Sequence, residues 1–409
     1  MHDYQILRVR KIFLDNDPNF EKLSPLIETK ETNSNKPLID EDSLTEALEA
    51  MMPWLKDGFG NPSSLHSFGR EARKAVEDAR ATIAECLHAE PKEIFFTSGG
   101  TEANNWAIKG TTGGLLVSAY EHHSVLNAAA SERRKERKVA FAKPTKRGQV
   151  GLRQLTASWF DRVGLVSVMA ANNEIGAVNR IGDLCAKVHQ DGALFHTDAV
   201  QAVGKIRIDV REWDVDFLSA SAHKFGGPKG VGFLYAAGGR APTRLLDGGG
   251  QEREARAGTE NVAGIVGMAA ALKICRERQM DSSIALLMSA NLLREDISKI
   301  FPTAVFQGPE KPRDRIPGFV SVTIPGHPAE GMLHVFDLKG IAVSAGAACN
   351  SKETKVSHVL KAIGLSDEAA RCTLRISIGP SNTVEDIERI LAVFRIIKKT
   401  GTGSPARKT

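Results

Sequence analysis

Residues 217–230 of this 409-residue chain read FLSASAHKFGGPKG, and the other informative motifs relate to this stretch. Phe217–Ser221 is a short run of apolar and small residues, which is typical of a buried strand. The run ends at His223 and Lys224, a glycine-rich turn follows, and Val231–Tyr235 predicts a second buried strand. The sequence therefore predicts a strand–turn–strand unit with a lysine where the first strand ends.

Lys224 has the surroundings expected of a nucleophilic amine. A lysine at the end of a buried strand loses water around its ammonium, which lowers its pKa. The unprotonated amine can condense with an aldehyde to form a Schiff base. Ser221 and His223 before it, with the glycine turn after it, can hold an anionic group such as a phosphate. These features indicate pyridoxal 5'-phosphate as cofactor, whereas the alternative is an ordinary surface lysine at a strand end.

Length and composition are those of an ordinary soluble globular protein. The length exceeds what one hydrophobic core usually organises, so we expect a large and a small domain. The net charge of +5 is modest, and the one dense basic run, residues 133–138, has no interleaved aromatic residues. We interpret this run as the solvated end of a helix and expect no direct contact with nucleic acid.

The sequence contains no segment long and apolar enough to span a membrane, and its N-terminus has no signal-peptide core. Its cysteines are few, widely spaced and odd in number, without the spacing of paired metal ligands: Cys86, Cys185, Cys275, Cys349 and Cys372. This pattern indicates reduced thiols. We therefore expect a cytoplasmic protein with no bound metal.

The order of apolar runs predicts an α/β fold in two parts. Strands and helices alternate, which is the signature of a mostly parallel sheet flanked by helices. The expected strands are 93–97, 115–118, 163–169 and 193–197, and the expected helices include 69–88 and 262–300. We divide the chain into an irregular N-terminal segment packing near the small domain, a large cofactor-binding domain, a small α+β domain and a disordered tail, with bounds 1–40, 41–289, 290–397 and 398–409.

Most polar candidates directly follow a predicted strand. Open α/β sheets bind ligands at the carboxyl ends of their strands. Gly100 and Thr101 precede a helix expected to start near Glu102, and free N–H groups there can take a phosphate, although such turns are often purely structural. Asp198 can pair with a protonated pyridine nitrogen or can simply cap a helix. His122 can stack on a ring and move protons, or can be an ordinary core or surface histidine.

Six motifs in order resemble one known family. They are GNPSSLH at 60–66, TSGGTEANN at 97–105, NNEIG at 172–176, HTDAVQ at 196–201, SASAHK at 219–224 and RAGT at 256–259. Together they are similar to the cysteine desulfurases, in the class-V aminotransferase group of fold-type-I pyridoxal-phosphate enzymes. The resemblance extends from about residue 58 to residue 390 and implies a large domain with a mostly parallel sheet plus a smaller α+β domain.

The resemblance also implies a role for each matching position. Lys224 would form the internal Schiff base, Asp198 would pair with the ring nitrogen, and His122 would stack on the ring. Gln201 would bond the phenolic oxygen, and Thr259 would reach the phosphate of a neighbouring subunit, which implies a homodimer. The remaining positions would bind the cofactor phosphate or the substrate α-carboxylate; they are Gly100, Thr101, Ser221 and His223 for the phosphate, and Asn173 and Arg375 for the carboxylate.

Cys349 is the expected nucleophile among the five cysteines. Cys86, Cys185 and Cys275 lie on apolar faces of predicted helices, and Cys372 lies beside the strand of Arg375. Cys349 instead follows small residues and precedes polar ones, with two lysines nearby to lower the pKa of its thiol. The long-loop desulfurases carry their sulfur-accepting cysteine at this position.

The reaction that the resemblance implies converts L-cysteine to L-alanine and passes sulfur, as a Cys349 persulfide, to a protein acceptor for iron–sulfur cluster assembly or thiolation. The alternatives are a selenocysteine lyase or another lyase or aminotransferase with the same cofactor, and a catalytically weak binding partner. The family's opening Leu-Asp-Asn-x-Ala-Thr-Thr is matched at 14–16, but Asp17-Pro18-Asn19-Phe20 and a polar insertion replace its remainder.

Overall fold

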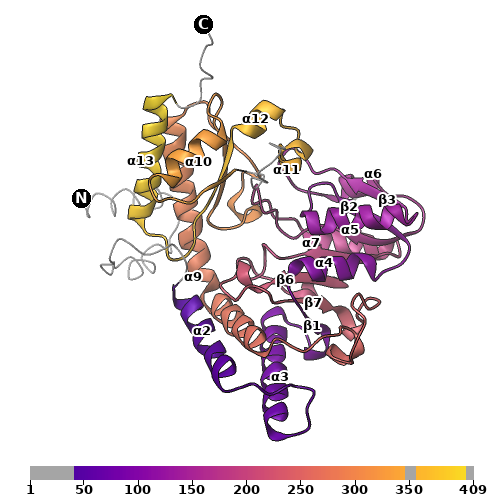
Figure 1. Cartoon of the computed structure of the whole chain (residues 1–409). Coiled ribbons are helices and arrows are strands. Elements are labelled where there is room, and N and C mark those ends of the chain that lie inside the picture. The colour runs from indigo at the N-terminus through magenta and orange to yellow at the C-terminus, as the bar shows by residue number, and fades with distance from the viewer. Residues whose placement is uncertain (1–40, 346–355, 402–409) are drawn as a thin grey trace, which may run out of the picture. The chain divides into compact units, whose positions relative to one another are not determined.

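A computed structural model describes residues 41–345 and 356–401, and they form two sheets with helices around them (Figure 1). The expected entry strand at 11–16 and the insertion at 17–40 lie outside the described residues. The seven-stranded sheet contains β1 (Ile94–Thr97), β2 (Gly114–Ser118), β3 (Val139–Ala142), β4 (Val163–Ser167), β5 (Leu194–Asp198), β6 (Phe217–Ser221) and β7 (Gly232–Ala236). The four-stranded sheet contains β8 (Val305–Phe306), β9 (Phe319–Thr323), β10 (Ser344–Ala345) and β11 (Thr373–Ser377).

The helices precede, connect and follow these strands. They are α2 (Glu41–Lys56), α3 (Ser67–Leu87), α4 (Gly100–Lys109), α5 (His123–Arg134), α6 (Leu152–Ala157), α7 (Ile181–Gln190), α8 (Val210–Trp213), α9 (Val262–Ile300), α10 (Ala329–Asp337), α11 (His358–Ala362), α12 (Asp367–Arg371) and α13 (Val384–Thr400). Side-chain caps fix several starts. Thr383 and Asp386 form a capping box at α13, for example, and His122 caps α5 by accepting from the Ser124 N–H. Among the described residues no helix combines the length and apolarity needed to cross a bilayer.

The large sheet is mostly parallel, as the sequence predicts. Its order is β1-β7-β6-β5-β4-β2-β3, and all neighbouring pairs from β6 to β3 are parallel. Only β7 is antiparallel to its neighbours β1 and β6. Since β7 is antiparallel to both β1 and β6, these two strands run in the same direction. The carboxyl ends of β1, β2, β4, β5 and β6 therefore lie at one edge of the sheet.

Both faces of the large sheet are covered, and the side chains of each strand alternate between two cores. In β1, Phe95 enters a core with α4 and α5, while Ile94 and Phe96 enter a core with α3, α7 and α9. Trp106 and Ile83, one from each core, are completely buried. Coverage on both faces explains why β2, β6 and β7 are buried along their whole length and consist mostly of apolar and small residues.

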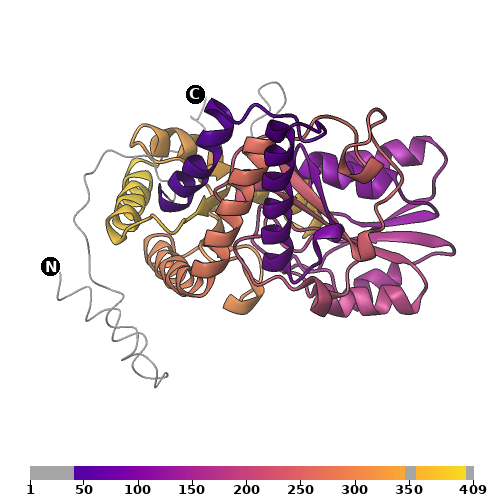
Figure 2. The same cartoon turned by 90° about the horizontal axis from the view of Figure 1, so that it is seen from below.

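The second sheet has its own core, and α9 joins the two regions. Its order is β10-β11-β9-β8, with every pair antiparallel. Leu293, Phe336 and Phe394 from α9, α10 and α13 pack on it. The first half of α9 packs on α2 and α3, and α13 packs against the same long helix (Figures 1 and 2). Since α9 is continuous across residue 290, the domain division placed there stays a prediction.

Most predicted elements are confirmed, and three details are corrected. The 69–88 and 262–300 helices match α3 and α9 within two residues. The expected disordered tail begins too early, because α13 continues to Thr400 and ends at Gly401, whose φ of 59° stops the helix. Arg137 in the basic run is half-buried, since it donates to the carbonyls of Gly113 and Ile108. Finally, β3 was not predicted, and of α5 only the basic end was interpreted as helical.

Candidate active site

Most predicted site residues lie at or shortly after the carboxyl ends of five strands of the large sheet. Gly100 and Thr101 follow β1, His122 follows β2 and Asn173 follows β4. Asp198 is the last residue of β5, and Gln201 lies three residues on. Ser221 ends β6, and His223 and Lys224 form the short 3-10 turn after it. This is the edge at which open α/β sheets bind ligands.

A tight cradle surrounds the first turn of α4. A Cβ added to Gly100 would lie 2.5 Å from Cγ2 of Val200, so no larger residue fits there. Gly99 has a φ of 146°, a conformation that favours glycine, and a Cβ on it would lie 3.4 Å from Oγ of Ser221. The Ser221 hydroxyl is 3.0 Å from Nδ1 of His223. Free N–H groups at a helix start, a hydroxyl and an imidazole together suit a phosphate.

Asp198 is a buried carboxylate with a donor on each oxygen. The N–H of Val200 donates to Oδ1 at 2.9 Å, and Nδ2 of Asn104 donates to Oδ2 at 2.7 Å. Burial raises the pKa of Asp198, while the two donors and the nearby His122 and Lys224 act in the opposite direction. A buried, fixed carboxylate of this kind can pair with a cationic ring nitrogen.

Lys224 and Gln201 are placed as donors toward the same edge. Partial burial and the charge of Arg375 lower the pKa of Lys224, and Asp198 opposes them. Nζ of Lys205 donates to Oε1 of Gln201 at 2.8 Å, which leaves the Gln201 amide N–H groups as donors. Burial, then Lys224 and Arg375, lower the pKa of Lys205 to about 8.

Arg375 forms a separate corner of the site. Its Nη1 donates to the carbonyl of Asn173 at 2.7 Å, and its buried Nε has no hydrogen-bond partner within residues 41–345 and 356–401. Glu174 is 6% exposed and accepts from the hydroxyl of Ser357. Burial raises the pKa of Glu174 to about 7, although Ser357 and Arg375 act against the rise. The corner combines a partly unpaired guanidinium with a buried acid.

Cys349 lies outside the described residues, but both flanks of its segment end at this corner. Ser344 in β10 is paired with Arg375 in β11, and Ser357 caps α11 while it donates to Glu174. The chain therefore leaves and rejoins the described structure beside the Arg375 corner.

The four described cysteines are held in structural surroundings. Burial raises the pKa of Cys86 to about 11, and also raises the pKa values of Cys185 and Cys372. The thiol of Cys275 donates to the carbonyl of Phe225. In the described ranges no cluster of three His, Cys, Asp or Glu side chains has metal-binding geometry.

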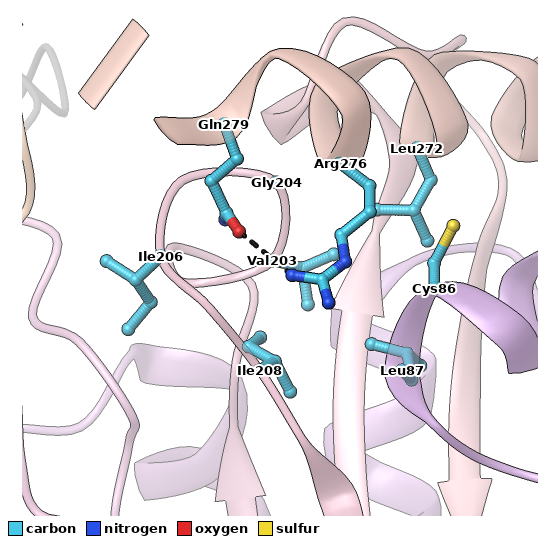
Figure 3. Close-up of a pocket in the computed structure, with 9 residues that line it drawn as sticks. All are labelled: Cys86, Leu87, Val203, Gly204, Ile206, Ile208, Leu272, Arg276 and Gln279. Atoms are coloured by element: carbon cyan, nitrogen blue, oxygen red, sulfur yellow. Dashed lines mark hydrogen bonds between the residues drawn. The ribbon is translucent and has the colours of Figure 1, made fainter. Parts of the chain in front are cut away.

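Two pockets lie away from Lys224. Thr259 lines one of them, with Ser98, Gly230 and Arg256 among its walls, and Arg256 forms an ion pair with Glu102. The other pocket is shown in Figure 3 and lies between α3, α9 and the 203–208 segment. Its polar lining consists mainly of the hydrogen-bonded pair of Arg276 and Gln279, without an acid or base suited to catalysis.

Five site residues escaped the sequence interpretation. Asn104 and Glu174 lie inside quoted motifs, but a motif does not show which side chain is buried. Ser124 and Lys205 have no sequence signal beyond their closeness to His122 and Gln201. Glu121 is completely buried, and burial and Asp198 raise its pKa well above the ordinary value. A polar residue at an apolar helical position, as at Asn104, is the clearest signal available.

The geometry fits pyridoxal phosphate. The glycine cradle at α4 suits its phosphate, the buried Asp198 suits its ring nitrogen, and the Lys224 amine suits its aldehyde. The fold and this set of groups together define a fold-type-I pyridoxal-phosphate enzyme.

Comparison with known proteins narrows the class. The family model for class-V aminotransferases matches residues 42–390. The chain is 42% identical to the cysteine desulfurase IscS of Clostridium botulinum, over 88% of this chain and 93% of that one. A solved NifS-like protein superposes with a TM-score of 0.81 at 33% identity, covering 89% of this chain and 97% of the other. SspA, solved in complex with cysteine, superposes with a TM-score of 0.71 at 33% identity, covering 85% and 97%. The chain belongs to the class-V aminotransferase family, in its cysteine desulfurase group.

Proposed function

We propose that this protein is a cysteine desulfurase that converts L-cysteine to L-alanine and passes the sulfur to an acceptor protein. The observation that carries the proposal is that Asp198 and Lys224, at the edge of the large sheet, lie close to Arg375 of β11, since Asp198 and Arg375 both affect the pKa of Lys224: an amine, a buried carboxylate and a partly unpaired guanidinium. The amine and the carboxylate serve the cofactor, and the guanidinium serves an amino-acid carboxylate.

Each group has an assigned task in this proposal. Arg375 and Asn173 bind the α-carboxylate of the substrate, because a planar guanidinium grips a carboxylate with two hydrogen bonds. Lys224 would hold the cofactor through its aldehyde, Asp198 would pair with the ring nitrogen and favour its protonation, and His122 would stack on the ring. The other cofactor contacts are Gln201 at the phenolic oxygen and Gly100, Thr101, Ser221 and His223 at the phosphate.

Proton and sulfur movements then follow from these positions. The bound cofactor withdraws electrons from the bonds at the substrate α-carbon. Lys224 takes and returns protons there, and His122 assists. The Cys349 thiolate attacks the substrate sulfur, so a sulfur–sulfur bond forms and the carbon–sulfur bond breaks. The carbon fragment keeps the electron pair, gains a proton and leaves as alanine, and Cys349 keeps the sulfur as a persulfide.

The assay measures alanine and sulfide from L-cysteine in the presence of a reductant. Lys224→Ala and Cys349→Ser should each abolish both products, and Cys86→Ser, which alters a buried thiol, serves as the matched control. The same assay with selenocysteine and cysteine sulfinate separates the desulfurase from a selenocysteine lyase or another lyase. Equal activity of parent and Cys349→Ser would refute the assignment of the nucleophile.

The site is proposed to be completed across a cytoplasmic homodimer, with Thr259 reaching the phosphate of the partner. Mixing Lys224→Ala with Thr259→Ala subunits tests this arrangement. In a mixed dimer one site carries both changes and the other carries none, so activity should exceed that of either variant alone. If mixed dimers form without any gain, Thr259 does not act across the dimer.

A further inference from the structure

A chain of three hydrogen bonds connects Asp198 to His122 through two residues that have no role in the proposed reaction. It runs through Asn104 and Ser124, which are 1% and 7% exposed. We propose that Asn104 and Ser124 are positioning residues, which fix the His122 ring as the neutral tautomer with its proton on Nε2. The proposal rests on the proposed function, because it defines the state in which His122 would move protons.

The direction of the first two hydrogen bonds follows from Asn104. Its amide nitrogen lies 2.7 Å from Oδ2 of Asp198 and 2.8 Å from Oγ of Ser124. An amide nitrogen has two protons and accepts none, so it donates to both oxygens. Ser124 therefore receives a hydrogen bond from Asn104 and has one proton left to donate.

That remaining proton goes to His122. Oγ of Ser124 is 2.8 Å from Nδ1 of His122, and the Ser124 backbone N–H also donates to this nitrogen at 3.1 Å. A nitrogen that accepts from two donors carries no proton of its own. A neutral imidazole has a single N–H, so it must be at Nε2. Nε2 is then the nitrogen that can give a proton to a substrate.

Charges around the ring favour the same neutral state. His122 caps the 12-residue helix α5, and the positive end of a helix disfavours an imidazolium. Burial lowers the pKa of His122, and His123 and Lys224 lower it further, while Asp198 raises it. His358 is a fourth titratable neighbour, whose own pKa is lowered in part by His122.

The shared amide favours the ionised form of Asp198 and, through Ser124, the neutral form of His122. Donation from Asn104 favours the ionised form of Asp198, because a hydrogen bond to a carboxylate stabilises its charge. The same amide orients Ser124 so that its proton faces Nδ1. A buried carboxylate and a neutral imidazole are thus maintained side by side by one side chain.

The test uses the cofactor-loaded enzyme with 15N-labelled histidine. Nitrogen chemical shifts distinguish Nε2–H, Nδ1–H and doubly protonated rings, and the His122 signal is assigned by its loss in His122→Gln. The parent should show Nε2–H. Ser124→Ala should admit the Nδ1–H tautomer and move the titration of His122 up by about 0.5 to 1 pH unit, which is the value of one lost hydrogen bond. Ser124→Thr keeps the hydroxyl and should restore the parent signal.

Two results would overturn the proposal: an Nδ1–H ring in the parent, or an unchanged tautomer and titration in Ser124→Ala. The parent measurement needs no variant, so it decides the question even where a variant does not fold. The signal needs no turnover, so a chain that makes no alanine but shows the Nε2–H ring contradicts the proposed reaction and leaves this inference standing.

Discussion

Glu174→Gln changes a buried acid beside the arginine that is proposed to bind substrate. Glu174 is 6% exposed and accepts a hydrogen bond from Ser357, and glutamine keeps the shape and an acceptor oxygen. Arg375 is close enough to lower the pKa of Glu174, but burial dominates and raises it from 4.5 to about 7. The substitution therefore removes one buried titration and little else.

The sign of the effect follows from proton uptake. A carboxyl group whose pKa is raised on folding binds more protons in the folded chain than in the unfolded chain, so stability falls as pH rises from about 4.5 through about 7. Each pH unit of that interval is worth about 1.4 kcal/mol. The free energy of unfolding of Glu174→Gln, measured relative to that of the parent, should therefore rise by about 2 to 3 kcal/mol from pH 5 to pH 8.

Urea unfolding of both chains at pH 5, 6, 7 and 8 measures this difference. Glu295→Gln, which removes an exposed carboxylate from α9, controls for the loss of one negative charge. The reasoning would be refuted if the difference in free energy of unfolding between Glu174→Gln and the parent stayed constant over this range. It would have the wrong sign if the variant became more stable relative to the parent as the pH falls.

Three further predictions concern substrate binding, the core and the thiols. Arg375→Lys should raise KM for L-cysteine by about 10-fold or more with less change in kcat, because a lysine lacks the planar group that makes two parallel hydrogen bonds to a carboxylate. An unchanged KM in steady-state kinetics would place the substrate carboxylate elsewhere. Arg80→Met breaks a buried ion pair with Glu252, so urea unfolding should show that the free energy of unfolding falls by about 3 to 5 kcal/mol. The double variant with Glu252→Gln should recover most of this loss. Equal losses in the single and the double variant would contradict this account. Cys86 and Cys372, whose thiol pKa values are raised by burial, should resist brief alkylation at pH 8. Rapid labelling of either residue, detected by mass spectrometry, would contradict this prediction.

The fold was largely predictable because its central strands are buried on both faces. A strand such as β6, which is buried throughout, favours apolar and small residues along its whole length, and Phe217–Ser221 has that pattern. The edge strand β3 escaped prediction because Val139–Ala142 is short and only partly buried. The start of α5 escaped prediction because it lies at a pair of histidines, and only the basic run at its end indicated a helix.

The site was predictable where a residue type has a special chemistry. Lys224 at a strand end and glycines before a helix are readable, since few residues can replace them. Asn104 and Ser124 were not, because amides and hydroxyls occur everywhere on protein surfaces. Their meaning comes from burial and from two contacts each, and these depend on how α4 packs against α5 and β5.

The central claim is that the site moves sulfur from L-cysteine to Cys349. The direct measurement is mass spectrometry of the protein after incubation with L-cysteine, without reductant and with proteolysis before analysis. The peptide that contains Cys349 should gain one sulfur atom in the parent and none in Lys224→Ala. Formation of alanine while Cys349 gains no sulfur, or while another cysteine gains it, would contradict the account.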